Sequence, residues 1–166
     1  SMGSLVAYRF AVGHPDRCRA IALLGTSVPM PVTDVLLNAA ADNDHAAIEM
    51  INTWSHSSLG KLGANSNPGV WMMGTGERLL ERASRGVLHA DLGACHSFAE
   101  VSHEAMCPAL VIAAGADLMT PARAGLEVAK ALPNAEIVNL DGCGHFMLSE
   151  RPNDVLDALA MFAKGL

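Results

Sequence analysis

The feature that constrains the fold most is residues 109–114, an apolar run that no polar side chain interrupts. A strand with apolar side chains on both faces belongs inside a parallel sheet that helices cover on each side. Residues 20–24 form a shorter run of the same kind, which Gly25 ends. A third strand is expected at residues 136–140, after the turn that begins at Pro133. The sequence therefore predicts an α/β protein with a three-stranded parallel sheet.

Helical patterns alternate with these strands. Residues 4–12 carry apolar side chains on two helical faces, which predicts a helix that is buried on most sides and ends at Gly13. Thr120 is suited to be the N-cap, and Pro121 the first residue, of a helix that extends to about residue 132. A final helix has one apolar face, formed by Val155, Leu159, Phe162 and Leu166. This alternation indicates right-handed crossovers within one sheet.

The stretch between the first two strands differs in composition from the rest. From about residue 33 to residue 105 it is rich in Ala, Asn, Ser, His and Gly. Its helical patterns are interrupted at Gly60, Gly63, Pro68, Gly69, Gly74 and Gly76, and residues 74–76 are interpreted as a turn rather than a dinucleotide-binding motif. The predicted organisation has three parts. Residues 1–32 hold the first helix and strand, residues 33–105 form an inserted helical layer, and residues 106–166 resume the sheet.

The composition narrows the classes of ligand. A net charge of −6 without a basic run argues against nucleic acid or an anionic membrane, so a small molecule is the favoured partner. The cysteines form no CxxC pair, which argues against a disulfide framework and fits a reducing, cytoplasmic compartment. No stretch has the length and apolarity of a membrane span. Hydrophobic residues make up 51% of the chain and charged residues 17%, which we interpret as part of a larger core.

Two loop residues are candidates for catalysis. Asp117 follows the strand at residues 109–114, and His145 follows the strand at residues 136–140. Since the carboxyl ends of parallel strands meet at one edge of a sheet, the two side chains are expected to lie close together. A carboxylate beside an imidazole holds the ring in one tautomer and stabilises its charged form, as a general base requires. The alternatives are helix capping by Asp117 and a surface position for His145.

A candidate nucleophile begins the chain. The segment Ser1-Met2-Gly3-Ser4 precedes the first helix and matches the second half of a G-x-S-x-G elbow, in which small residues permit a tight turn. The backbone N–H of Met2, at the helix N-terminus, is then expected to face an oxyanion. Ser-Met can also remain after removal of a purification tag. Ser1 is therefore either a natural nucleophile or a remnant of such a tag.

Four segments in this order resemble the α/β-hydrolase family over essentially the whole chain. They are residues 1–7 (SMGSLVA), 14–17 (HPDR), 115–121 (GADLMTP) and 142–152, which run from Gly-Cys-Gly-His-Phe to Glu-Arg-Pro. The resemblance implies a partial α/β-hydrolase fold, with three parallel strands, flanking helices and residues 33–105 as a helical cap insertion. It points to capped esterases, lactonases and C–C-bond hydrolases, and the serine at position 1 speaks against the dehalogenase branch, which has aspartate there.

The resemblance also implies roles for the candidate residues. Ser1 would be the nucleophile, His145 the base and then the acid, Asp117 the orienting carboxylate, and the Met2 N–H an oxyanion donor. The implied reaction is hydrolysis of a small, largely apolar ester, lactone or related acyl substrate through an acyl-enzyme, without a cofactor. The first five strands of the family pattern lie outside the sequence, so the fragment alone is expected to be inactive. A non-catalytic protein that binds a small ligand is the alternative.

The remaining expectations concern the pocket, metals and partners. Substrate is expected to contact Trp54, Trp71, Met72 and Phe146, although packing within the cap also explains the first three. A metal site is not expected, because the spacings of His89, Cys95, His96, His103 and Cys107 match no zinc pattern. Cys143 is expected to be buried and unreactive. Residues 19–24 would lie at an open, apolar sheet edge, which predicts self-association or pairing with a separately supplied N-terminal half.

Overall fold

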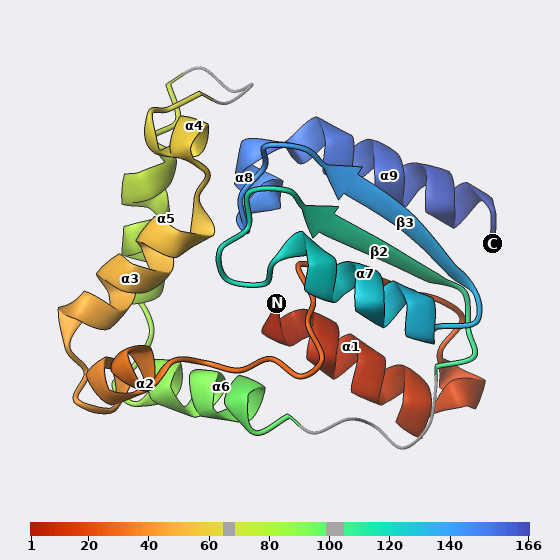
Figure 1. Ribbon diagram of the computed structural model, residues 1–166, viewed down its shortest axis with the longest axis horizontal. Coiled ribbons are helices and arrows are strands. Elements are labelled where there is room, and N and C mark those ends of the chain that lie inside the picture. The colour runs from red at the N-terminus through yellow and green to blue at the C-terminus, as the bar shows by residue number, and fades with distance from the viewer. Residues whose placement is uncertain (65–68, 99–104) are drawn as a thin grey trace.

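The computed structural model describes residues 1–64, 69–98 and 105–166, so Pro68 and His103 lie outside it. Within the described residues one parallel sheet has the order β1-β2-β3 (Figure 1). Its strands are β1 (Ile21–Leu24), β2 (Ala109–Ala114) and β3 (Ala135–Leu140). All three strands end at the same side of the sheet. The predicted α/β class with three parallel strands is confirmed.

Helices cover both faces of this sheet (Figure 1). On one face lie α1 (Met2–Gly13) and α7 (Ala122–Ala131), and on the other lies α9 (Pro152–Lys164). Two short helical segments complete this part of the chain, the 3-10 helix η1 (Pro15–Arg17) and α8 (Met147–Glu150). The predicted helices that flank the sheet are therefore confirmed.

The position of β2 between two helical layers explains its apolar sequence. Val111 faces one side of the sheet, where it packs with Tyr8 of α1 and Val128 of α7. Ile112 faces the opposite side, where it packs with Val155 of α9. All residues of β2 are buried, so a polar side chain at any of these positions would lose its contact with water without gaining a partner.

Further described helices follow β1 and precede β2, and they stand beyond the carboxyl ends of the strands (Figure 1). They are α2 (Asp34–Ala41), α3 (His45–Ser55), α4 (Ser58–Lys61), α5 (Met72–Glu81) and α6 (Val87–His96). We call these helices the helical layer. Leu36 of α2, Ile51 of α3 and Leu92 of α6 pack together, so the layer has a core of its own. Its role as a cap over substrate stays a prediction.

The predicted turn at residues 74–76 is wrong, because these residues lie inside α5. A Cβ at Gly74 would collide with the ring of Trp71, and a Cβ at Gly76 would collide with the side chain of Asn52. Glycine at these positions permits close packing on a continuous helix. The sequence pattern alone does not distinguish this use of glycine from chain reversal.

Three other helix expectations also need correction. Gly60 was expected to interrupt a helix but lies within α4. The N-cap of α7 is Pro121 rather than Thr120, because the Thr120 hydroxyl forms hydrogen bonds elsewhere, as described below. Leu166 follows the end of α9 and is 41% exposed, so it does not extend the apolar face of that helix.

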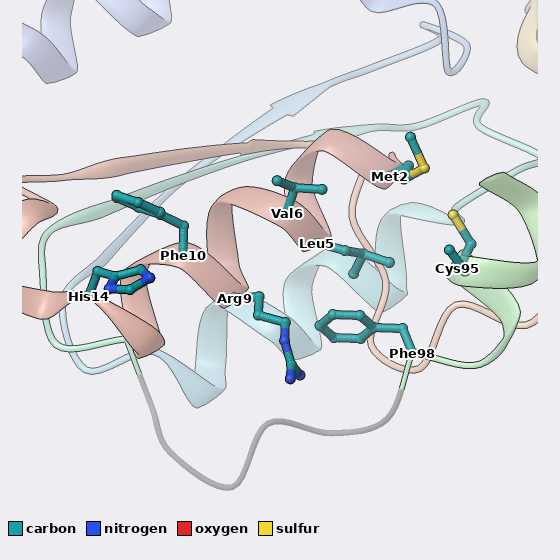
Figure 2. Close-up of a pocket in the computed structure, with 9 residues that line it drawn as sticks. Met2, Leu5, Val6, Arg9, Phe10, His14, Cys95 and Phe98 are labelled. Carbon is teal, nitrogen blue, oxygen red and sulfur yellow. The ribbon is translucent and has the colours of Figure 1, made fainter. Parts of the chain in front are cut away.

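The first helix is less buried than its sequence predicts. Leu5 and Tyr8 are buried, but Val6 is 62% exposed and Phe10 is 39% exposed. This second face borders an apolar groove of about 340 Å³ that lies between α1 and the end of α6 (Figure 2). Leu5 and Phe98 pack together within it. The helix therefore buries one face against the sheet, while its other apolar face lines the groove.

The cysteines are free thiols. Cys18 and Cys107, distant in sequence, bring their Sγ atoms to 3.9 Å from each other. Cys143 is buried, as predicted, and burial together with the charge of Glu150 raises the pKa of its thiol to about 12. Such a thiol stays protonated at neutral pH and is a poor nucleophile.

Within residues 1–64, 69–98 and 105–166, no helix is both long enough and apolar enough to cross a membrane.

Candidate active site

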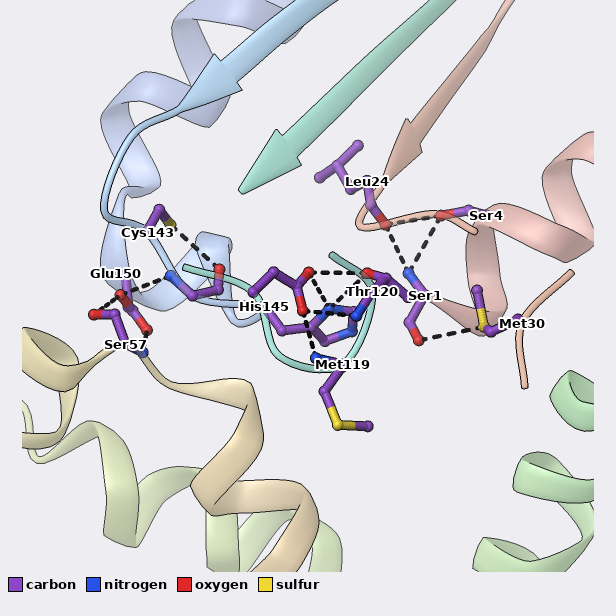
Figure 3. Close-up of polar contacts among 12 residues, drawn as sticks. Ser1, Ser4, Leu24, Met30, Ser57, Met119, Thr120, Cys143, His145 and Glu150 are labelled. Carbon is purple, nitrogen blue, oxygen red and sulfur yellow. Dashed lines mark hydrogen bonds and ion pairs between the residues drawn. The ribbon is translucent and has the colours of Figure 1, made fainter. Parts of the chain in front are cut away.

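The side chains of Asp117 and His145 meet beyond the carboxyl ends of β2 and β3 (Figure 3). His145 Nδ1 lies 2.7 Å from Asp117 Oδ2. The Asp117 side chain is fully buried, and that of His145 is 9% exposed. Because β2 and β3 are neighbours in register, the loops that follow them start side by side and need only a few residues to bring the pair together.

Hydrogen bonds hold the Asp117 carboxylate in its ionised form. Oδ1 accepts from the backbone N–H groups of Met119 and Thr120, each at 2.8 Å, and Oδ2 accepts from the Thr120 hydroxyl at 2.9 Å. Burial raises the pKa of Asp117, but the hydrogen bond and charge of His145 and the bonds from Thr120 outweigh it and lower the pKa below 3.8. An ionised Asp117 accepts the Nδ1–H of His145, which leaves Nε2 available to take a proton.

Thr120 belongs to the site, although the sequence predicts it only as a helix N-cap. Its hydroxyl oxygen lies 2.9 Å from Asp117 Oδ2 and 3.2 Å from His145 Nδ1, so it contacts both members of the pair. The signal in the sequence was a hydroxyl residue three positions after a loop aspartate. Such spacing commonly produces local side-chain hydrogen bonds as well as helix caps.

Gly25 is a second residue whose importance appears only in the structure. It follows β1 with φ of +56°, a conformation that favours glycine. A Cβ at this position would lie 2.9 Å from Cε1 and 3.0 Å from Nδ1 of His145. The sequence indicated only that Gly25 ends a strand. In the fold it also leaves the space that the imidazole occupies.

Replacement of Gly25 by alanine is therefore expected to displace His145. We expect a loss of about 1–2 kcal/mol in the free energy of unfolding from the left-handed backbone, and a shift of the NMR resonance of the His145 Nδ1 proton from the displaced ring. Urea unfolding and NMR measure the two effects. Gly86→Ala is the matched control, because Gly86 has φ of +82° and open space around it, so it should lose stability but keep the His145 resonance in place. Equal shifts of the resonance in the two variants would contradict the prediction.

Ser1 is the N-cap of α1, and its nitrogen donates to the carbonyl oxygen of Leu24 at 2.6 Å (Figure 3). Its hydroxyl contacts Met30 Sδ at 4.0 Å. Met2 begins the helix, where backbone N–H groups lack an intrahelical acceptor. Ser1 and His145 line one pocket of about 320 Å³. Among the hydrogen bonds of the described residues, none joins the Ser1 hydroxyl to His145, so only Asp117 and His145 of the predicted triad are directly bonded.

The residues predicted to contact substrate are divided among different environments. Phe146 lines the pocket that Ser1 and His145 share. Trp54 lines a neighbouring pocket of about 140 Å³, which also includes Ser1. Trp71 is 67% exposed and Met72 is buried, and neither lines these two pockets. The shared pocket has a largely apolar wall, formed by Leu24, Leu79, Phe146, Met147 and Leu148 together with Thr75, Gly76 and Ser149.

In the part of the chain that the structure describes, metal-ligand geometry occurs at a place that the sequence did not indicate. His45, Glu77 and Glu81 bring their ligand atoms within 4.8 Å of one another on the surface of α3 and α5. His45 Nε2 lies 3.1 Å from Glu81 Oε1, and this hydrogen bond raises the pKa of His45. His96 is one of the residues whose spacing was compared with zinc patterns above. Its Nδ1 lies 3.0 Å from the carbonyl oxygen of Val32.

Comparison with known proteins gives a family match over nearly the whole chain. The model of the alpha/beta hydrolase family matches residues 1–158. A curated relative, the pimeloyl-[acyl-carrier protein] methyl ester esterase of Chromobacterium violaceum, is 28% identical over 171 residues, which cover 96% of this chain and 66% of that protein.

Solved structures share the fold. A thermophilic esterase superposes with a TM-score of 0.82 at 24% identity, over 98% of this chain and 62% of its own. The enol-lactonase from Burkholderia xenovorans LB400 superposes with a TM-score of 0.80 at 19% identity, over 99% of this chain and 63% of its own. The chain thus spans slightly less than two thirds of the length of these relatives. With a family match from Ser1 to residue 158 and the same fold in these proteins, the chain belongs to the alpha/beta hydrolase family.

Proposed function

We propose that this chain supplies the nucleophile, base and acid of a serine hydrolase that acts on a small, largely apolar ester, lactone or related acyl substrate. The observation that carries the proposal is the 2.7 Å contact between His145 and the buried Asp117, next to a pocket that Ser1 and His145 share. The apolar wall of that pocket favours an apolar acyl or alkyl group. The names of the relatives, esterases and a lactonase, support the same class of reaction.

In the proposed first step Ser1 forms an acyl-enzyme. Rotation of the Ser1 side chain releases its hydroxyl from Met30 and directs it to His145 Nε2. His145 takes the hydroxyl proton while Oγ attacks the substrate carbonyl carbon, and the carbonyl oxygen becomes an oxyanion near the Met2 N–H. Asp117 stabilises the charged imidazolium. The C–O bond to the leaving group then breaks, and the alkoxide takes the proton from His145.

In the second step water regenerates the free serine. His145 Nε2 removes a proton from a water molecule, whose oxygen attacks the acyl carbon. The bond to Ser1 Oγ breaks, Oγ recovers the proton from His145, and the carboxylic acid leaves and ionises in water. For a lactone the same steps yield one hydroxy acid, because the leaving group remains attached to the acyl chain.

A second candidate function is non-catalytic binding of a small ligand in the same pocket. The observation that favours it is the contact of the Ser1 hydroxyl with Met30 instead of His145. A binding protein of this kind would keep the apolar pocket and would not acylate Ser1. The two functions therefore differ in the reactivity of a single oxygen atom.

A fluorophosphonate probe distinguishes the two candidates, because it labels only an activated serine. The test compares the chain with a longer form that includes any residues encoded upstream of Ser1 in its gene. The form that the probe labels is called the active form below. We expect labelling to disappear in Ser1→Ala and to persist in Ser149→Ala, since Ser149 is an exposed serine in the same pocket. Labelling that survives Ser1→Ala excludes Ser1 as the nucleophile, and labelling of no form favours the binding protein.

We also propose that the outer edge of β1 pairs with another chain beside Ala22, since the outward carbonyl of Leu24 already accepts from Ser1 and Ser4. β1 is at one end of the sheet, and the N–H groups of Ile21 and Gly25 donate toward β2. Since N–H groups alternate along a strand, the N–H of Ala22 faces the open edge. An edge of this kind is a template for an added strand, from a second copy or from an N-terminal half supplied separately.

Self-association through this edge is expected to raise the mass of the isolated chain with concentration. Ala22→Pro removes the outward N–H without removing a bond to β2, and proline is tolerated at an edge strand. Light scattering after size exclusion is expected to show a smaller mass for this variant than for the unaltered chain. A stable monomer of the unaltered chain at high concentration contradicts the proposal.

A further inference from the structure

A buried carboxylate connects the helical layer to the loop that carries His145. Glu150, the last residue of α8, is 5% exposed. Its Oε1 accepts from the backbone N–H of Ser57 at 2.8 Å, and its Oε2 accepts from the Ser57 hydroxyl at 2.6 Å. Oε2 also accepts from the backbone N–H of Gly144 at 3.1 Å. One side chain thus joins the start of α4 to the residue that precedes His145 (Figure 3).

The residue that follows His145 is held to the same part of the helical layer. The backbone N–H of Phe146 donates to the carbonyl oxygen of Ser55 at 3.0 Å. Ser55 is the last residue of α3 and Ser57 is the N-cap of α4. The backbone N–H groups of the residues before and after His145 are therefore hydrogen-bonded to the junction of α3 and α4, that of Phe146 directly and that of Gly144 through Glu150.

Two glycines allow this close approach. A Cβ at Gly60 would lie 2.8 Å from Glu150 Cδ, and a Cβ at Gly144 would lie 2.6 Å from Glu150 Oε1. Residues other than glycine at these positions would push the carboxylate away from its donors. The glycine at position 60, within α4, is thus explained by the space that Glu150 needs.

We infer that Glu150 is a positioning residue that fixes the His145 loop against the junction of α3 and α4. The inference rests on the proposed function, since it assigns Glu150 a role in orienting the proposed base. The Asp117 carboxylate orients the ring from one side, through Nδ1, while Glu150 fixes the backbone that carries the ring. A hydrogen-bonded, buried carboxylate suits this task because its two oxygens accept from several donors at once.

Glu150→Gln tests the inference, with Ser57→Ala as the matched variant. Glutamine keeps the shape but replaces one acceptor oxygen by an NH₂ group, which cannot accept from Gly144 and the Ser57 hydroxyl. Ser57→Ala removes one donor to the carboxylate and leaves the bond to Gly144 in place. The measured quantities are the NMR resonance of the His145 Nδ1 proton in the chain itself, and kcat and KM of the active form.

Glu150→Gln is expected to shift or broaden the His145 Nδ1 proton resonance and to lower kcat about 10- to 100-fold with KM nearly unchanged. Ser57→Ala is expected to leave the resonance in place. A folded Glu150→Gln protein with an unchanged resonance and unchanged kcat overturns the inference. If the resonance shifts but no form of the protein hydrolyses esters, the positioning role stands and the proposed function fails.

Should Glu150→Gln not fold, Glu150→Asp carries the test. Aspartate keeps the charge but is shorter, so it cannot reach both Ser57 and Gly144. The same shift of the His145 resonance is expected in this variant. An unchanged resonance in folded Glu150→Asp overturns the inference, because the bond to Gly144 would then have no effect on the ring.

Discussion

Replacing His145 with alanine is expected to lower kcat for hydrolysis of a small ester by roughly 10⁶-fold in the active form. Among the residues that the structure describes, the imidazole is the only side chain bonded to Asp117 that can take a proton from Ser1 and return it to the leaving group. Without it the serine hydroxyl remains protonated and is a weak nucleophile. Hydrolysis of p-nitrophenyl acetate, followed by absorbance, measures the loss.

The control for this variant is His89→Ala, which removes an exposed histidine from α6. We expect the control to keep the activity of the unaltered protein, since His89 does not line the pocket that Ser1 and His145 share. A His145→Ala protein that retains even a tenth of the activity contradicts the assignment of the base. In that case the hydrogen bond between His145 and Asp117 is structural.

Asp117→Asn is expected to lower kcat by about 10⁴-fold, because an amide facing Nδ1 no longer favours the tautomer with a free Nε2. The same variant should change how stability depends on pH. The pKa of Asp117 in the folded protein is below 3.8, so the ionised carboxylate stabilises the fold above that pH. This stabilisation is lost as the pH falls through the lower, folded-state pKa.

Urea unfolding at several pH values checks the second effect. The difference in the free energy of unfolding between the unaltered protein and Asp117→Asn is expected to be largest near neutral pH and to shrink at pH values below 3.8. A difference that stays constant from neutral to acidic pH would show that the charge of Asp117 does not contribute. Asp16→Asn, at an exposed position in η1, serves as the control.

Some elements were predictable from the sequence because a single local pattern dictates them. β2 has the bounds that its apolar run predicts, since a strand that is buried on both faces admits only apolar side chains. Asp117 and His145 were predictable as neighbours for a topological reason, because loops after adjacent parallel strands emerge at one edge.

Other features depend on side-chain contacts that no periodic pattern specifies. Gly74 and Gly76 have the same local signal as a turn, yet they lie in a helix, where Trp71 and Asn52 occupy the space that a Cβ would fill. Thr120 carries a signal for a helix cap, but the nearby carboxylate of Asp117 competes for its hydroxyl. No local pattern reports which of two hydrogen bonds a side chain will form.

The sequence by itself determined the α/β class, the three strands and the pairing of Asp117 with His145. Only the tertiary structure decided how that pair is held, through the space at Gly25, the hydroxyl of Thr120 and the carboxylate of Glu150. The reason is physical. The periodicity of apolar residues indicates which side of a helix or strand faces the core. The position of a reacting group depends instead on distances of a few ångströms between segments that lie far apart in the sequence.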